Sequence, residues 1–252
     1  MKSIVILLLS VIALAGCGRK GPLIPPEALV PATVQNLAVR QQDGDLVLTW
    51  TAPAREQGGR PLKDLAGFRL QRRYIAGDGS DCAACSEAWR TVAEIDADFP
   101  GQARRDGANF RYAERGLAAG RQYQYRLTVL SRSGGSSGPA TTRSVTVRPP
   151  LAPPQLTLAV TPTAVRLGAE ASLPAGAKLL GYNIYRREAG GAVPYRPLNP
   201  QPSPATVWDD TQVKPGSSYR YSATVVVELA GDPVESAPSP EREIAFVAPE
   251  FR

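Results

Sequence analysis

Cysteines are the residues of this 252-residue chain whose chemistry and spacing are most distinctive. Cys17 ends a run of small residues near the N-terminus, and Cys82 and Cys85 form a C-x-x-C pair, which can be half of a zinc site, a redox dithiol or a local disulfide. The sequence contains no His, and this excludes Ser-His-Asp and Cys-His catalysis as well as His-ligated zinc. A nucleophile elbow, a phosphate-binding loop and a dinucleotide fingerprint are also missing. The sequence therefore predicts a protein that is not an enzyme and that has no cofactor and no metal.

The first 17 residues have the pattern of an export signal. Lys2 gives a basic start, an apolar run covers residues 4–14, and small residues come directly before Cys17. This segment resembles the signal of bacterial lipoproteins, which implies cleavage before Cys17 and acylation of its thiol and of its new amino group. The mature chain would then be residues 17–252, anchored in a membrane through its first residue. An uncleaved helical anchor is disfavoured, because a membrane-spanning helix needs about 20 apolar residues.

The surroundings of the mature chain follow from one residue and from the net charge. Gly18 follows Cys17, whereas in the resembling lipoproteins an Asp at this position retains the protein in the inner membrane. The resemblance therefore implies the outer membrane, on its periplasmic face or at the cell surface. A net charge of +6 fits a surface near lipid phosphates, anionic glycans or acidic proteins. Export removes the chain from nucleic acid, so nucleic acid is not an expected partner.

Export also decides between the three uses of the C-x-x-C pair. Zinc takes four ligands, and Cys82 and Cys85 supply two. A thioredoxin-like dithiol needs its first Cys at the start of a helix, whereas this pair stands in a loop between predicted strands. Exported compartments are oxidising, and Cys17 is assigned to acylation, which leaves an even pair. We therefore expect a Cys82–Cys85 disulfide that fixes the loop, and we favour it over redox activity and over metal binding.

An internal repeat indicates which elements position these residues. Residues 67–73 (GFRLQRR) match residues 181–187 (GYNIYRR), and residues 117–123 (LAAGRQY) match residues 213–219 (VKPGSSY). The first match alternates apolar and polar residues, and the second places a Gly turn before a Tyr that opens an alternating run. Short alternating runs punctuated by 24 Pro and 23 Gly predict an all-β protein.

The repeat resembles the fibronectin type III domain. That family carries a Trp on its second strand, here Trp50, and an L-x-P-G-x-x-Y tyrosine corner, here ending at Tyr123 and at Tyr219. The resemblance implies two tandem β-sandwiches with structural corner tyrosines, whose rings join the core and whose hydroxyls bond to backbone. The second copy departs from the pattern, because Leu167 stands near the Trp position, and Trp208 is expected to fill part of that core. One immunoglobulin-like domain with an unrelated neighbour is the alternative, and the two matched corners disfavour it.

The spacing divides the chain into five segments. They are a signal peptide (1–16), a lipidated Pro-rich stalk (17–33), a first fibronectin-like domain (34–148), a Pro-rich linker (149–154) and a second fibronectin-like domain (155–248). Gly67 and Tyr123 are 56 positions apart, against 38 for Gly181 and Tyr219, so the first domain carries 18 extra residues between its third and sixth strands. These residues are expected to form long polar loops, which are a frequent place for binding on a rigid scaffold.

The segment after the signal carries a second resemblance. Residues 17–26 (CGRKGPLIPP) resemble the start of the small LptM-type lipoproteins, which read C-G-x-K-G-P-L followed by Pro. That family associates with the outer-membrane translocon for lipopolysaccharide and helps it mature, although its members usually lack two sandwich domains. Two functions follow. The first is a non-enzymatic envelope lipoprotein whose fibronectin-like domains bind a protein or a glycan through the insertion and the Arg-rich strand edges. The alternative is an accessory factor in assembly of the lipopolysaccharide translocon, acting through residues 17–26.

Overall fold

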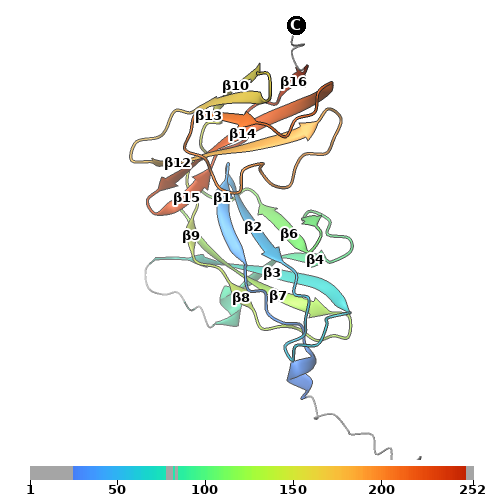
Figure 1. The fold of residues 1–252 in the computed structure, drawn as a ribbon. Helices are drawn as coiled ribbons and strands as arrows, with labels where there is room; N and C mark the ends of the chain where they lie inside the picture. Colours follow the sequence, from blue (N-terminus) through green and yellow to red (C-terminus); the bar gives the residue numbers. More distant parts are fainter. Residues whose placement is uncertain (1–24, 78–81, 83–84, 248–252) are drawn as a thin grey trace, which may run out of the picture.

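The structure is a computed structural model of residues 1–252, and it describes residues 25–77, 82 and 85–247. Two β-sandwiches follow one another along the chain, with residues 25–29 at one end of the molecule and β16 at the other (Figure 1). The helices of the described part are single 3-10 turns, η1 (Pro26–Leu29) and η2 (Ser86–Ala88). In this part of the chain no helix is long and apolar enough to cross a membrane.

The first sandwich consists of two sheets that face each other across one core. One sheet has the order β1-β2-β6-β5, from Ala38–Gln42, Asp45–Thr51, Asn109–Glu114 and Arg104–Asp106. The other has the order β4-β3-β7-β8, from Arg90–Asp96, Leu65–Ile75, Gln122–Ser131 and Ala140–Thr141, and β9 (Val145–Thr146) also pairs with β7. Inward positions alternate with outward ones along each strand, and on β7 every second residue is buried.

The second sandwich repeats this plan. One sheet has the order β10-β11-β13, from Gln155–Val160, Val165–Glu170 and Val207–Asp210. The other contains β12 (Lys178–Glu188), β14 (Ser217–Leu229), β15 (Asp232–Glu235) and β16 (Arg242–Phe246), with β14 in the middle. In both sandwiches the first two strands share one sheet with the strand that precedes the corner, β6 or β13, while the strands of the repeated motifs, β3 and β7 or β12 and β14, pair in the other sheet. This is the strand arrangement of fibronectin type III domains, so the predicted fold class, all-β with two tandem fibronectin-like sandwiches, is confirmed.

The two cores are filled differently at the matched second strand. In the first core the ring of Trp50 lies edge-on to Phe68, with centroids 5.4 Å apart, and stacks on Phe110 at 5.7 Å. In the second core Leu167 is buried opposite its cross-strand neighbour Trp208, which packs against that core from a partly buried position. The smaller residue on the second strand is thus complemented by a larger one on the strand beside it.

The segment between β3 and β6 combines loops, as expected, with the two strands β4 and β5, which were not expected. Residues 90–96 pair as β4 with β3, and the side chain of Ile95 among them is buried in the core. Residues 104–106 pair as β5 with β6. In the second sandwich the Pro-rich residues 194–203 lie along β12 instead, where the amide of Leu198 donates to a β12 carbonyl at 2.7 Å.

The glycines of the repeated motif are required by these close approaches. Gly67 lies at a bulge in the pairing of β3 with β7, and Gly181 lies at a bulge in the pairing of β12 with β14. A Cβ at Gly67 would lie 2.1 Å from the carbonyl oxygen of Ile95 on β4. A Cβ at Gly181, whose φ is 140°, would lie 2.5 Å from the carbonyl carbon of Ser203. Each Gly therefore lets the covering segment reach the edge of the sheet.

The end of the predicted stalk is part of the first sandwich. The amide of Ala32 donates to the carbonyl of Arg55 at 3.0 Å, and the carbonyls of Ala28 and Val30 accept from residues 57–58 at 2.9 Å. These bonds hold residues 28–32 against a turn that precedes β3. The segment boundaries predicted from sequence otherwise stay a prediction.

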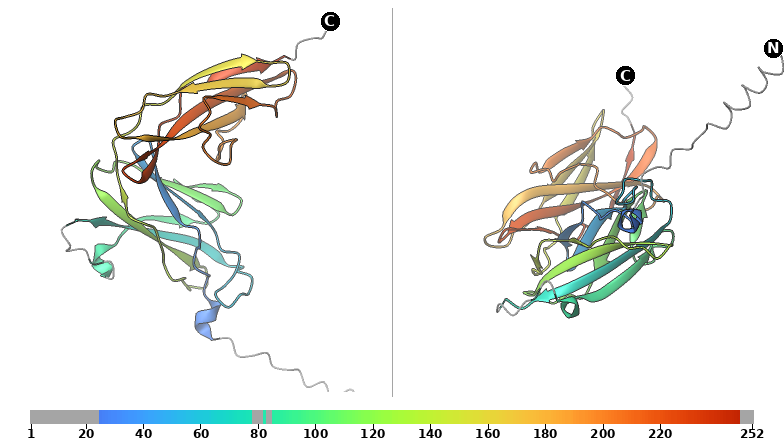
Figure 2. Two further views of the ribbon diagram at one scale, coloured as in Figure 1. Left: turned by 60° about the vertical axis from the view of Figure 1, so that its left-hand side comes forward. Right: turned by 90° about the horizontal axis from the view of Figure 1, so that it is seen from below.

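One twisted sheet runs through both sandwiches and joins them. The strand β15 of the second sandwich lies beside β1 of the first (Figure 2) and pairs with it in parallel. This pairing places Gln41 opposite Val234 and Gln42 opposite Glu235. The resulting order is β12-β14-β15-β1-β2-β6-β5. Backbone pairing therefore links the two sandwiches directly.

Gln41 secures this joint from within. Its side chain is 1% exposed, donates to the carbonyl oxygens of Asp43 and Arg148 at 2.8 and 2.7 Å, and accepts from the amide of Arg148 at 2.7 Å. Arg148 also lies 3.7 Å from Asp232, and Arg143 pairs with the same carboxylate. Arg148, the last residue before the linker, is therefore bonded to both sandwiches.

Replacing Gln41 with Leu is expected to loosen the joint while leaving both cores intact. The change removes three hydrogen bonds and leaves buried backbone groups of Arg148 without their partner, at a cost of roughly 1–3 kcal/mol. We expect hydrogen exchange of the Arg148 amide to speed up by about tenfold or more, which corresponds to about 1.4 kcal/mol. The control Gln35→Leu, at an exposed position, should leave this exchange rate unchanged. Equal protection of Arg148 in both variants would contradict the role of Gln41.

Candidate functional site

The structure places the predicted cysteines as follows. Cys17 lies outside the described residues. Cys82 and Cys85 form a disulfide on the surface of the first sandwich, in the loop between β3 and β4. Within the described residues, no group of three or more His, Cys, Asp or Glu is placed to hold a metal ion.

A ladder of stacked side chains fixes the loop that carries the disulfide. Trp89, directly after η2, is buried, and the guanidinium groups of Arg126 and Arg73 lie 4.6 and 5.5 Å from its ring centroid. Each of these Arg side chains also donates at 2.7 Å to a Gln of the neighbouring strand, Arg73 to Gln124 and Arg126 to Gln71. The insertion is thereby held flat against the outer face of β3 and β7.

Because Trp89 already fixes the loop, the disulfide is expected to add little global stability. A pair only three positions apart closes a short loop and removes little entropy from the unfolded chain. We expect the double variant Cys82→Ser and Cys85→Ser to lower the free energy of unfolding by about 1 kcal/mol or less. Protein alkylated without reduction should carry no label at either position in mass spectra. Two labelled thiols in envelope-purified protein, or turnover of a dithiol substrate that is lost in the variant, would contradict the structural disulfide.

The two predicted corner tyrosines lie at matched places in the two cores. Tyr123 and Tyr219 are both buried. The hydroxyl oxygen of Tyr219 accepts a hydrogen bond from the backbone amide of Lys214 at 2.9 Å, which is the geometry of a tyrosine corner. The ring of Tyr123 lies beneath the guanidinium of Arg72, 5.0 Å from the ring centroid. That the two side chains are structural stays a prediction.

A buried polar triad near each corner was missed by the sequence reasoning. In the first sandwich the hydroxyl of Tyr125 donates to Glu114 at 2.7 Å, and Arg72 pairs with the same carboxylate. Burial raises the pKa of the Glu114 carboxyl, while the bonds from Tyr125 and Arg72 act in the opposite direction. Burial and the neighbouring carboxylate raise the pKa of the Tyr125 hydroxyl well above its ordinary value.

The second sandwich contains the same triad at matched positions. The hydroxyl of Tyr221 donates to Asp210 at 2.8 Å, and Arg186 donates to the same oxygen at 2.6 Å. Asp210 precedes the second corner, Tyr219, by the same number of residues as Glu114 precedes the first, Tyr123. Aligning the two repeats beyond the quoted motifs would have found this signal.

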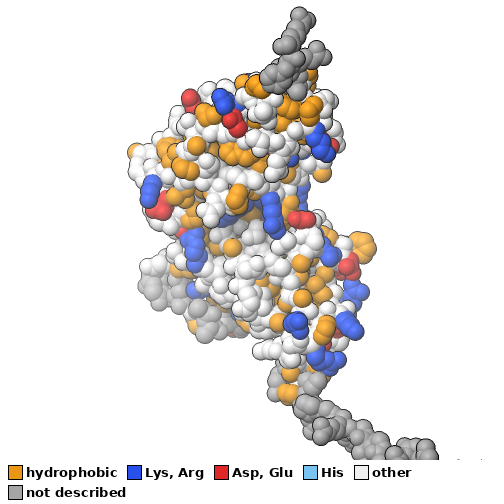
Figure 3. All heavy atoms as spheres, in the orientation of Figure 1, with side chains coloured by type: hydrophobic (Ala, Val, Ile, Leu, Met, Phe, Trp, Pro, Cys, Tyr) orange, Lys and Arg blue, Asp and Glu red, His pale blue; other side chains and the backbone are white. Residues whose placement is uncertain are grey.

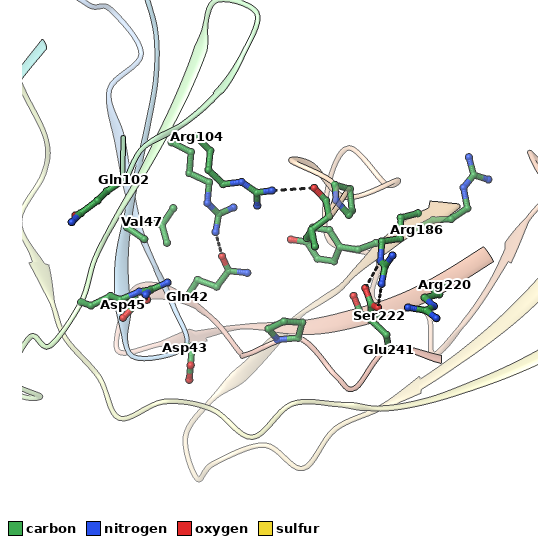
Figure 4. A pocket seen from close by; sticks show the side chains of 18 residues that line it. Gln42, Asp43, Asp45, Val47, Gln102, Arg104, Arg186, Arg220, Ser222 and Glu241 are labelled. Atoms are coloured by element: carbon green, nitrogen blue, oxygen red, sulfur yellow. Dashed lines mark hydrogen bonds and ion pairs between the residues drawn. The ribbon is translucent and has the colours of Figure 1, made fainter. Parts of the chain in front are cut away.

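A hollow lies between the two sandwiches, and we call it the interdomain trough. It is defined by Gln42, Gln102, Arg104 and Arg111 of the first sandwich and by Tyr185 and Ser222 of the second. Its walls are the outward faces of β2, β5 and β6 on one side and of β12 and β14 on the other (Figure 4). The volume of this hollow is 370 Å³, and an adjoining hollow of 610 Å³ continues beneath the Pro-rich segment of the second sandwich.

A loop of the second sandwich crosses the trough. Residues 190–200 leave β12 and reach the first sandwich, where Arg104 Nη2 donates to the carbonyl oxygen of Val193 at 3.1 Å (Figure 4). Tyr195 and the following prolines line the adjoining hollow. Arg111 lines both hollows, so it marks the point where the trough passes under this loop.

A single buried carboxylate lies at the floor of the junction. Glu235 is 2% exposed, and its Oε1 accepts from Tyr185, Thr224 and Asn183 at 2.7 to 3.0 Å. Burial, and after it the charge of Glu235, raise the pKa of the Tyr185 hydroxyl. Arg40 of the first sandwich approaches Glu235 to 3.7 Å. Figure 3 shows basic side chains at the waist where the two sandwiches meet.

Comparison with known proteins separates the N-terminal segment from the sandwiches. Residues 4–26 match the conserved region of the LPS-assembly lipoprotein LptM family. The N-terminal segment is LptM-like. The match ends before the first strand, and no curated protein sequence matches the chain.

The chain is also similar in structure to several chicken proteins. The FN1–FN3 domains of chicken CNTN1 share 14% identity with a TM-score of 0.38, covering 92% of this chain and 75% of that chain. A two-domain fibronectin type III segment of chicken tenascin shares 18% identity with a TM-score of 0.31, covering 84% of this chain and 99% of that chain. The chicken interferon gamma receptor alpha chain shares 14% identity with a TM-score of 0.33, covering 87% of this chain and 99% of that chain.

Proposed function

We propose that this chain is a non-enzymatic lipoprotein of the outer membrane that binds a protein or a glycan between its two sandwiches. The observation that carries the proposal is the interdomain trough, an open hollow with basic and polar side chains in its walls. It lies between two sandwiches that are joined by the pairing of β1 with β15. Ligand sites are often hollows of this size at domain interfaces. The residues Gln102 and Arg104 belong to the insertion of the first sandwich, so the extra residues of the chain contribute directly to this site.

Lipid anchoring supplies the other half of the proposal. The LptM-like match includes the residues before and after Cys17, which supports acylation at that residue. The described chain from residue 25 onward then lies outside the bilayer, with the first sandwich nearer the anchor and the trough beyond it. A binding site in this position faces partners of the envelope.

A role in lipopolysaccharide assembly is the second candidate, and the match of residues 4–26 to the LptM family favours it. In this case residues 17–26 would recruit the translocon, and the sandwiches would be an addition that the small family members lack. The two candidates differ in which part of the chain binds.

Crosslinking in native envelopes followed by affinity purification tests both candidates. The full-length protein is compared with a variant in which residues 18–26 are scrambled and Cys17 is kept, so that anchoring is preserved. A partner that persists in the scrambled variant supports binding by the sandwiches. Enrichment of the lipopolysaccharide translocon that disappears on scrambling supports the second candidate and would overturn the first.

A further inference from the structure

Two arginines of the trough face each other without an acidic partner. Arg104 on β5 and Arg111 on β6 are direct cross-strand neighbours. Like charges directly opposite on one sheet face destabilise the pairing of the strands. Among the described residues no carboxylate lies within 4 Å of either guanidinium, and each donates to a neutral acceptor instead, Arg104 to the carbonyl of Val193 and Arg111 to the side chain of Gln42.

The other arginines of the trough are neutralised. Arg115 lies 3.4 Å from Asp45, Arg187 donates to Glu241 at 2.8 Å, and Arg220 donates to Glu243 at 2.8 Å. Among the arginines of the trough that the structure describes, Arg104 and Arg111 are thus the two without a carboxylate within 4 Å. This leaves two forked donors with N–H groups to spare on one wall of the trough.

The surroundings of Arg111 disfavour the charged form of its guanidinium group. The side chain is half-buried, and burial, followed by the charge of Arg40, lowers the pKa of its guanidinium. Arg40 itself lies 3.7 Å from Oε2 of Glu235, whose other oxygen, Oε1, accepts from three donors of the second sandwich. An anion bound between Arg104 and Arg111 would relieve both the repulsion and the desolvation.

We infer that the interdomain trough binds a phosphorylated saccharide, with its phosphate group held between Arg104 and Arg111. A phosphate monoester offers several terminal oxygens to two guanidinium forks, each of which binds phosphate in bidentate fashion. The trough is larger than one anion, and its remaining walls carry the polar side chains of Gln102 and Ser222, which suit sugar hydroxyls. The inference deepens the proposed function, since it names the chemistry of a glycan partner.

Calorimetric titration of the full-length acylated protein in non-ionic detergent tests the site with glucose 1-phosphate, inorganic phosphate and glucose as probes. We expect glucose 1-phosphate to bind about tenfold more tightly than inorganic phosphate, and glucose not to bind measurably. Inorganic phosphate that binds as tightly as the sugar phosphate would overturn the saccharide assignment. Absence of binding by both phosphate probes would overturn the site itself.

Matched variants separate this site from general basic charge. The variant Arg104→Gln should weaken glucose 1-phosphate binding by about tenfold or more, while its melting temperature stays equal or rises because the repulsion with Arg111 is removed. The control Arg166→Gln removes an exposed Arg that pairs with Asp209 on the far sheet of the second sandwich, and it should bind as wild type does. Equal weakening by both variants would overturn the site. The crosslinking result with the 18–26 scramble does not depend on these titrations, so failure of the proposed function is recognised separately.

Discussion

Replacing Tyr125 with Ala is expected to lower the free energy of unfolding of the first sandwich by about 3–5 kcal/mol. The side chain is fully buried, and its hydroxyl donates to the partly buried carboxylate of Glu114. The substitution opens a cavity and leaves Glu114 with Arg72 as its charged partner. Tyr221→Ala should have an effect of the same size on the second sandwich, because Asp210 and Arg186 repeat the arrangement.

Urea unfolding monitored by far-ultraviolet circular dichroism measures this effect. The variant Tyr125→Phe isolates the hydroxyl and should cost about 1–3 kcal/mol, since it leaves a partly buried charged acceptor short of a donor. Phe99→Ala is the matched control, because this aromatic side chain is 84% exposed and its loss should change stability by about 0.5 kcal/mol or less. A Tyr125→Ala protein as stable as the Phe99→Ala protein would contradict the triad as an element of the core.

Replacing Cys17 with Ser is expected to release the protein from the outer membrane or to block its processing. Acyl chains on one residue supply the attachment that we propose, and two or more chains give stable anchoring where a single one is marginal. Fractionation of envelopes by density separation measures the distribution. The double variant Cys82→Ser and Cys85→Ser controls for the loss of a thiol, and it should remain in the outer-membrane fraction. A Cys17→Ser protein that fractionates with the outer membrane as wild type does would contradict lipid anchoring.

The fold was predictable because local patterns specify it. Alternating runs with Gly and Pro between them mark the strands, and the matched motifs at Gly67 and Gly181 mark the same strand in both sandwiches. The strands β4 and β5 were not predicted, since short polar strands such as Arg104–Asp106 become strands only by pairing with a neighbour.

The candidate site was harder to predict, because it depends on how the two sandwiches meet. Nothing in the local sequence of β1 or β15 signals that Gln41 will pair with Val234 of the other sandwich. The trough follows from that pairing of the two sandwiches. The cross-strand pair of Arg104 and Arg111 follows from the pairing of β5 with β6. The polar triads are different, since Glu114 and Asp210 could have been aligned from the repeat alone.

The central claim is that the interdomain trough is where a partner binds, and site-specific photocrosslinking in living cells tests it most directly. A photoreactive amino acid is placed at Ser222 or Gln102 in the trough, and at the exposed Thr157 on the far sheet of the second sandwich as the control. The account predicts that irradiation yields the same adduct from Ser222 and from Gln102 and none from Thr157. Adducts of equal yield from Thr157, or no adduct from either trough position, would contradict it.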